Sequence, residues 1–139
     1  MIFLDTGFVF ALISPKDEHH ERALRVFEAL KTNGTAERLL TTNHVVAETI
    51  TLVRRIGHEE ATRVGDRLYS GDLARIYWAT PDDERTAFAW FKRHRDQTYS
   101  FVDCLSFVVM EKLGIREALT MDSDFTHRFV ARPGPKRSS

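Results

Sequence analysis

The first five residues, Met1 to Asp5, constrain the fold more than any other stretch of this chain. Residues 2–4 are Ile, Phe and Leu, an acid follows them, and Thr6 and Gly7 then lead into a second apolar run. A strand buried on both faces of a parallel sheet reads as such an uninterrupted apolar run. Open α/β sheets place their sites beyond the carboxyl ends of their strands. We therefore predict that a buried strand delivers the carboxylate of Asp5 to a functional site.

Strand and helix patterns alternate along the rest of the chain. We expect further strands over residues 38–42, 73–79 and 115–121, with a small fifth one at residues 129–130. Apolar spacing and end signals predict helices over residues 7–14, 17–34, 43–57, 58–70, 80–95 and 100–114. Strands that alternate with helices predict an α/β fold, in which helices flank a parallel sheet.

Length and composition favour one intracellular domain. The chain has 139 residues, 42% of them apolar, which suits a single domain over residues 1–131 with a basic, disordered tail over residues 132–139. A single cysteine, Cys104, excludes an internal disulfide framework. We find no signal peptide and no apolar run of the roughly 20 residues that a membrane span needs. We therefore expect a cytoplasmic protein that does not enter a membrane.

Four acidic residues stand out because each is embedded in apolar sequence. Asp5 and Asp122 end predicted strands, and Glu48 and Asp103 lie in predicted helices. Ionised carboxylates that are buried without partners cost several kcal/mol each or take up protons. Mg²⁺ and Mn²⁺ prefer oxygen ligands and are commonly held by a few carboxylates together with substrate phosphates. The four acids therefore predict a site for a divalent cation.

Each acid also has a simpler explanation. Asp5 could cap the helix that follows it, and Asp103 has capping-box spacing from Ser100. Glu48 could be a solvated helix residue, and Asp122 with Asp124 could form an Asx turn. The metal hypothesis is favoured by the conjunction, because two of these acids end strands at one sheet edge and two lie near helix starts that face it.

Four segments together resemble the PIN domain, and more narrowly the VapC-type ribonucleases of prokaryotic toxin–antitoxin systems. The segments are Phe3-Leu4-Asp5-Thr6-Gly7, residues 42–49 (TNHVVAET), residues 99–105 (YSFVDCL) and residues 119–125 (LTMDSDF). They occur in the family's order and spacing, and the resemblance covers residues 1 to about 131. One departure is Gly7, where Ser or Asn often follows the Asp-Thr pair.

The resemblance implies a three-layer α/β/α fold with strand order 3-2-1-4-5 and metal-dependent cleavage of RNA. By motif match, Asp5, Glu48, Asp103 and Asp122 take the four acidic positions. We expect Asp5 and Asp103 to be direct Mg²⁺ or Mn²⁺ ligands, and Glu48 and Asp122 to be ligands or to position water. Hydrogen-bonding support is expected from Thr6, Ser100 and the neighbouring Asp124. The resemblance also implies an antitoxin partner, with basic residues that enter the acidic pocket, and a homodimer.

The basic residues give only a weak prediction of an RNA-binding surface. Lys92, Arg93 and Arg95 are candidates for phosphate contacts, although such runs are usually solvated faces, and the net charge of zero leaves no global basic footprint. Two rival functions stay open at this point. One is a PIN-like protein that binds RNA or a partner without cutting, and the other is a haloacid-dehalogenase-like phosphatase. The phosphatase chemistry normally needs a second aspartate where this chain has Gly7.

Overall fold

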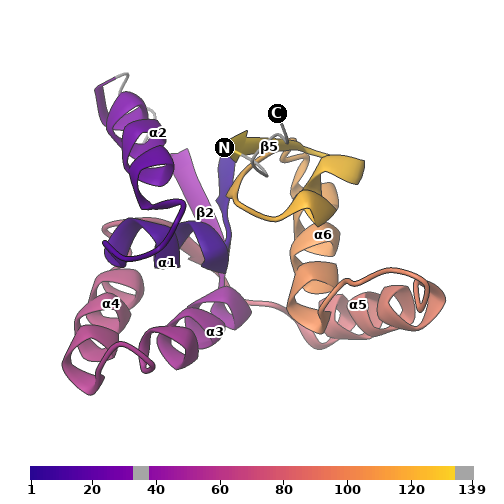
Figure 1. The fold of residues 1–139 in the computed structure, drawn as a ribbon. Coiled ribbons are helices and arrows are strands. Elements are labelled where there is room, and N and C mark those ends of the chain that lie inside the picture. Colours follow the sequence, from indigo (N-terminus) through magenta and orange to yellow (C-terminus); the bar gives the residue numbers. More distant parts are fainter. Residues whose placement is uncertain (33–37, 134–139) are drawn as a thin grey trace.

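The computed structural model describes residues 1–32 and 38–133, which form one α/β fold (Figure 1). The strands are β1 (Ile2–Leu4), β2 (Leu39–Thr42), β3 (Arg75–Tyr77), β4 (Glu117–Thr120) and β5 (Val130–Pro133). The helices are α1 (Thr6–Ile13), α2 (His20–Thr32), α3 (Asn43–Val53), α4 (His58–Ser70), α5 (Pro81–Arg93) and α6 (Phe101–Leu113), with a 3₁₀ helix η2 (Ser123–His127) between β4 and β5. No helix in this described part of the chain is long and apolar enough to cross a membrane.

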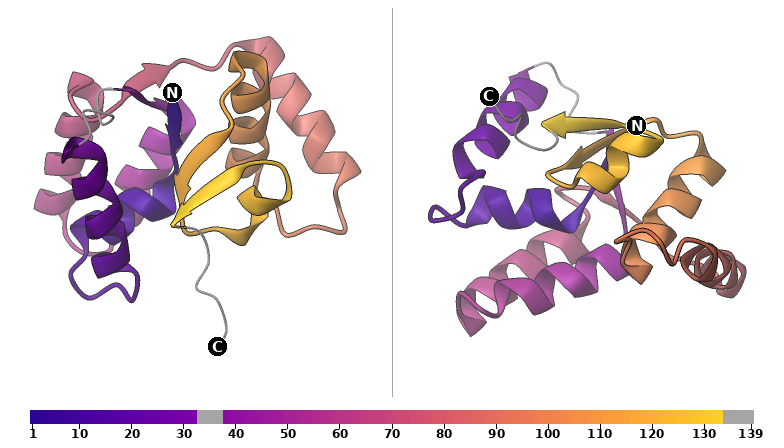
Figure 2. Two further views of the ribbon diagram at one scale, coloured as in Figure 1. Left: turned by 90° about the horizontal axis from the view of Figure 1, so that it is seen from above. Right: turned by 45° about the vertical axis from the view of Figure 1, so that its right-hand side comes forward.

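All neighbouring strands of the sheet are parallel, and their order is β3-β2-β1-β4-β5. This confirms the predicted fold class and strand order. The first strand lies at the centre, where Ile2 pairs with Leu39 on one side and Leu4 pairs with Leu119 on the other. Helices α1 to α4 lie on one side of the sheet, and α5 and α6 on the other (Figures 1 and 2).

The central strand is buried on both faces because alternate side chains enter two separate cores. Ile2 and Leu4 pack with residues of α1, α2, α3 and α4, whereas Phe3 packs with residues of α5 and α6. Neighbouring strands repeat this alternation, since Leu39 and Leu40 also point into opposite cores. An apolar residue at every position is therefore what this strand requires, as its sequence predicted.

Helix starts at the carboxyl edge of the sheet are fixed by short hydrogen-bonding motifs. Thr42 ends β2, and its hydroxyl accepts a hydrogen bond from the Val45 N–H at the start of α3. Helices α5 and α6 both begin with a capping box, formed by Thr80 with Asp83 and by Ser100 with Asp103. These motifs orient the starts of α3 and α6, and the two helices carry predicted site residues toward the end of β1.

The structure corrects several predicted element ends. The second helix begins at His20 rather than at residue 17, because the Asp17 side chain accepts a hydrogen bond from the His19 N–H in the preceding turn. Strand β5 runs to Pro133, two residues into the predicted tail, because Thr120 pairs with Pro133. The predicted helix end at Asn33-Gly34 and the remainder of the tail lie outside the described residues.

Candidate functional site

A hollow of about 580 Å³ lies at the carboxyl edge of the sheet, next to the end of β1. Its walls come from the start of α1, the middle of α3, the start of α6 and the segment after β4. The lining residues are Asp5, Thr6, Gly7, Glu48, Leu52, Ser100, Asp103, Met121, Asp122 and Ser123. The fold therefore brings all four predicted acids to one place, although they are spread from residue 5 to residue 122.

Asp5 forms the buried floor of the hollow. It follows β1 directly, its N–H donates to the Leu119 carbonyl over 3.0 Å, and only 5% of the residue is exposed. Asp5 occupies the N-cap position of α1, but its side chain makes no capping hydrogen bond. Its Oδ2 instead accepts a hydrogen bond of 2.8 Å from the Thr120 hydroxyl. The carboxylate is therefore oriented by the neighbouring strand β4.

Asp103 combines a capping role with a place in the hollow. Its N–H donates to the Ser100 hydroxyl, and its Oδ2 accepts from the Ser100 N–H, each over 3.0 Å. Among the described residues, Oδ1 of Asp103 has no such partner. The simple explanation of Asp103 as a capping residue is therefore correct, and it leaves one carboxylate oxygen available to a ligand.

Asp122 and Asp124 form the Asx-type turn that the sequence suggested. Oδ1 of Asp122 accepts a hydrogen bond of 2.9 Å from the Asp124 N–H, and the Thr98 hydroxyl donates to the Asp124 carboxylate over 3.3 Å. Carboxylate oxygens of Asp103, Asp122 and Asp124 all lie within 4.8 Å of one another, and all three residues are half-buried. Asp124 thus belongs to the tightest acidic group, although it does not line the hollow itself.

Glu48 faces this group from α3. It is half-buried and lines the hollow, but it lies outside the group of three oxygens that Asp103, Asp122 and Asp124 form. Thr6 lies beside Asp5, and its buried hydroxyl oxygen finds no hydrogen-bond partner among the described residues. A buried hydroxyl without a partner is costly, so a ligand or water in the hollow would remove a penalty at Thr6.

The acids in the hollow resist ionisation. Burial is the main reason that the pKa of Asp5 rises to about 7, and the nearby Asp103 carboxylate raises it further. Burial also raises the pKa of Asp103 to about 6, with Asp122 and Asp124 adding to the effect. The pKa of Asp122 is raised as well, first by burial. The described residues place no Lys or Arg in an ion pair with any of these acids.

These features fit a divalent cation. Several carboxylate oxygens converge, the buried Thr6 hydroxyl lacks a hydrogen-bond partner within the described part of the chain, and no Lys or Arg of that part is ion-paired with these acids. Oxygen-rich, acidic groups of this kind suit Mg²⁺ or Mn²⁺. The oxygens of Asp103, Asp122 and Asp124 lie closest together, and Asp5 lines the same hollow as Asp103 and Asp122.

Sequence reasoning missed two threonines that orient the acids. Thr120 ends β4 and contacts both Asp5 and the N–H of Asp122, and Thr98 contacts Asp124. The only signal in the sequence is the position of Thr120, two residues before Asp122. The predicted RNA-contacting residues Lys92, Arg93 and Arg95 are exposed around the end of α5 and do not line the hollow.

Comparison with known proteins gives a consistent result. The family model of the PIN domain matches residues 2–128. The curated "23S rRNA-specific endonuclease VapC20" of Mycobacterium tuberculosis is 39% identical over 127 residues, which cover 91% of this chain and 92% of that protein. A "VapC ribonuclease" of Archaeoglobus fulgidus is 33% identical over 131 residues, covering 93% of this chain and 81% of the relative.

A solved structure also resembles the fold. The crystal structure of Mycobacterium tuberculosis VapC20, described as a sarcin-ricin loop cleaving toxin, superposes with a TM-score of 0.82 at 37% identity. The alignment covers 91% of this chain and 94% of the other. The fold is therefore shared with a relative of nearly the same extent.

Proposed function

The chain belongs to the PIN domain family as a VapC-type toxin ribonuclease, and from this premise we propose that its acidic hollow cuts RNA with a bound divalent cation. The observation that carries the proposal is the group of three carboxylate oxygens, from Asp103, Asp122 and Asp124, within 4.8 Å of one another beside the buried Asp5. The phosphatase alternative is wrong, because the family and the strand order are those of a PIN domain.

Each side chain has a distinct part in this proposal. Asp5, Asp103 and Asp122 hold Mg²⁺ or Mn²⁺, and Thr120 and Ser100 keep two of these carboxylates in position. The bound ion supplies positive charge that lowers the pKa of water and balances the phosphodiester anion. Glu48, on the opposite wall, orients the attacking water and takes its proton as the water oxygen bonds to phosphorus. The bond from phosphorus to the leaving oxygen then breaks, and that oxygen takes up a proton from solvent. Thr6 donates its free hydroxyl hydrogen to a group in the hollow.

The direct test replaces Asp5 with Asn. Asp5→Asn keeps the size of the side chain but removes the negative charge, so we expect Mg²⁺-dependent RNA cleavage to fall by at least about 100-fold, in the range that a misassembled metal site costs. The parent protein with EDTA is the control. Undiminished cleavage by Asp5→Asn would contradict the metal assignment. Binding of RNA without any cleavage by the parent, across several RNAs with Mg²⁺ present, would instead favour the non-cutting alternative.

We also propose that the RNA target is a loop of ribosomal RNA, as the printed descriptions of VapC20 indicate for that protein. Support comes from identity of 39% across nearly the whole length of VapC20. The measurement is treatment of intact ribosomes and of total RNA with the protein and Mg²⁺, followed by mapping of the new RNA ends. A cut confined to messenger or transfer RNA would contradict this target. A ribosomal target also implies action in the cytoplasm.

Two protein partners belong to the proposal. An antitoxin that inserts basic residues into the hollow is supported by its uncompensated carboxylates, and a second copy of the chain is expected from the family. Co-purification with the product of a neighbouring short reading frame, together with loss of cleavage in that complex, tests the first. Light scattering of the isolated chain tests the second, and a mass of one chain at all concentrations would contradict it.

A further inference from the structure

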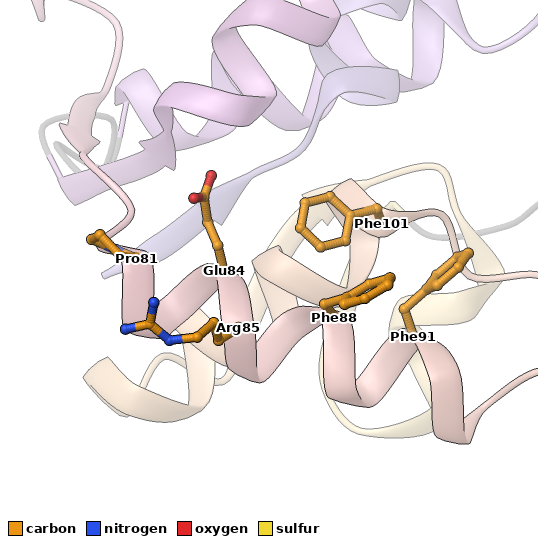
Figure 3. A pocket seen from close by; sticks show the side chains of 6 residues that line it. All are labelled: Pro81, Glu84, Arg85, Phe88, Phe91 and Phe101. Carbon is orange, nitrogen blue, oxygen red and sulfur yellow. The ribbon is translucent and has the colours of Figure 1, made fainter.

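An aromatic groove lies beside the acidic hollow, between α5 and the start of α6. It has a volume of about 540 Å³ and is lined by Pro81, Glu84, Arg85, Phe88, Phe91 and Phe101 (Figure 3). Phe88 and Phe91 rise from the same side of α5 with their rings nearly parallel, at an interplanar angle of 16° and a centroid distance of 6.4 Å. The ring of Phe101 meets Phe88 edge-on, with centroids 6.5 Å apart. The groove therefore presents a row of aromatic faces.

The groove adjoins the acidic hollow through Phe101. This residue follows Ser100 and precedes Asp103 by two positions in the first turn of α6. Its ring lies 6.0 Å from the His44 ring, and Nε2 of His44 lies 2.7 Å from Oε1 of Glu84. His44 is one helical turn before Glu48 on α3. The contact between His44 and Glu84 thus joins α3 to α5 between the groove and the acids.

The two phenylalanines of α5 are exposed to solvent, whereas other apolar residues of the same helix are buried in the core. Phe88 is 52% exposed and Phe91 is 41% exposed, whereas Ala87 and Trp90 on the same helix are buried. Contiguous exposed apolar side chains in a monomer commonly mark a binding site. Aromatic faces are the surfaces on which proteins stack the bases of single-stranded RNA.

Positive charge lies at the rim of the groove. The Lys92 ammonium is 5.0 Å from the centre of the Phe88 ring, and Arg85, which is ion-paired with Asp82, lines the groove. Glu84 also lines the groove, where it contacts His44, so the cation at the rim without an ion pair among the described residues is Lys92. Its ammonium favours an anionic occupant. An RNA whose scissile phosphate lies in the neighbouring hollow would pass beside this groove, which favours RNA as the occupant.

We propose that this aromatic groove binds an unpaired nucleobase of the RNA substrate, one or a few nucleotides from the phosphodiester that is cut. The proposal rests on the ribonuclease function proposed above and adds the part of the substrate that is recognised. Phe88 supplies the main stacking face, Phe101 closes the end nearest the acids, and Lys92 contacts a phosphate. The groove selects for a base that is already unstacked, as in an RNA loop.

The test combines protein variants with abasic RNA. A short oligoribonucleotide that contains the mapped cut site is prepared with each base in turn replaced by an abasic residue, and kcat/KM is measured with Mg²⁺. For the parent protein, we expect one abasic position near the cut to lower kcat/KM about tenfold, mainly through KM, because one stacked base is lost. Phe88→Leu should lower kcat/KM on intact RNA by about the same factor. For this variant, the abasic residue at the sensitive position should cause no additional loss of kcat/KM.

Matched variants separate stacking from other effects. Phe88→Trp keeps an aromatic face and should retain the abasic effect. Tyr69→Leu, at a residue of α4 that is 54% exposed, should behave as the parent does because Tyr69 does not line the groove. A flat abasic scan, or a Phe88→Leu variant with parent kcat/KM, would overturn the proposal. A lower mass of the Phe88→Leu protein in solution, relative to the parent, would also overturn it, because a second copy of the chain would then be the occupant of the groove. If the parent cuts no RNA, the proposed function itself fails, and this inference fails with it.

Discussion

The hydroxyl of Thr120 donates a hydrogen bond of 2.8 Å to Oδ2 of Asp5, which joins the ends of the two central strands. The Thr120 hydroxyl oxygen also accepts a hydrogen bond of 2.9 Å from the Asp122 N–H. Both side chains are buried, with Thr120 fully inaccessible and Asp5 only 5% exposed. One threonine therefore fixes the positions of two acids that β1 and β4 bring to the same edge, so its loss should disturb the metal site before it disturbs the fold.

Thr120→Val should weaken metal binding. The variant keeps the shape of the side chain but removes the hydroxyl that orients Asp5, and loss of such a supporting partner commonly costs about 10–100-fold in metal affinity. Titration of the protein with Mn²⁺, followed by calorimetry, measures the effect. Thr41→Val is the control, because the buried Thr41 hydroxyl donates to the Leu4 carbonyl and not to an acid. Equal Mn²⁺ affinity in Thr120→Val and in the parent would refute the role of Thr120.

The raised pKa values predict that the metal-free protein loses stability as pH rises. The pKa of Asp5 is about 7 and that of Asp103 about 6 in the folded chain, against an ordinary value of 3.8. Groups with a raised folded pKa stabilise the fold below their unfolded pKa, and this contribution disappears as pH rises through 6 to 7. We expect Tm with EDTA to fall between about pH 5.5 and about pH 8.

Added Mg²⁺ should raise Tm more at about pH 8 than at about pH 5.5, because the ion replaces protons at the same carboxylates. Thermal scans in one buffer series with EDTA or Mg²⁺ measure both slopes. Asp5→Asn provides the control and should show a flatter pH dependence with a smaller Mg²⁺ effect. A Tm in EDTA that does not depend on pH for the parent would contradict the prediction.

Much of this site followed from local sequence pattern. The apolar run before Asp5 and the capping box at Ser100 are short-range signals, and both have the predicted structure. The contact between Thr120 and Asp5 joins residues that are 115 positions apart, and a threonine at a strand end carries no mark of its partner. The aromatic groove could not be predicted from the sequence for another reason. Helical spacing places Phe91 on the same face as Ala87 and Trp90, but α6 covers only Ala87 and Trp90, and Phe91 is 41% exposed.

Asp83 should stabilise the half of the fold that carries the groove. Its carboxylate accepts hydrogen bonds from the Thr80 N–H, the Tyr77 hydroxyl and the Lys112 ammonium, and links β3, α5 and α6. Burial opposes its ionisation, but these donors hold the pKa of Asp83 at about 2. Asp83→Asn should lower the free energy of unfolding by about 1–3 kcal/mol, because the substitution removes the charged acceptor of these buried hydrogen bonds.

Urea denaturation at neutral pH measures this loss, with the exposed Asp82→Asn as the control. Because the pKa of Asp83 is lowered on folding, its contribution is present above about pH 4 and disappears as pH falls through about 2. The difference between Asp83→Asn and the parent should therefore shrink in acid. A constant difference across that range would contradict the assigned charge of Asp83.

Gly7→Ala should stabilise the chain. Gly7 lies in the first turn of α1, and an added Cβ would meet no atom closer than Oδ2 of Asp5 at 4.0 Å. Replacement of a helical glycine with alanine is worth about 0.5–1 kcal/mol when space permits. Gly65→Ala is the contrast, because a Cβ there would meet the Ile50 side chain at 3.2 Å. Urea midpoints of both variants test the difference, and a destabilised Gly7→Ala variant would show that the site needs glycine.

Glu48→Gln should separate catalysis from metal binding. Glu48 lines the hollow from α3 but lies outside the tight group of Asp103, Asp122 and Asp124, so its proposed work is on the attacking water. Loss of a general base commonly costs about 10²–10⁴-fold in rate. We therefore expect kcat for RNA cleavage to fall by that factor while Mn²⁺ affinity changes by less than about threefold, since the ligands with the closest oxygens remain.

Asp103→Asn should lower both quantities, and Glu59→Gln, at an exposed residue of α4, should lower neither. If Glu48→Gln and Asp103→Asn lose Mn²⁺ affinity equally, Glu48 is a ligand of the ion rather than the base.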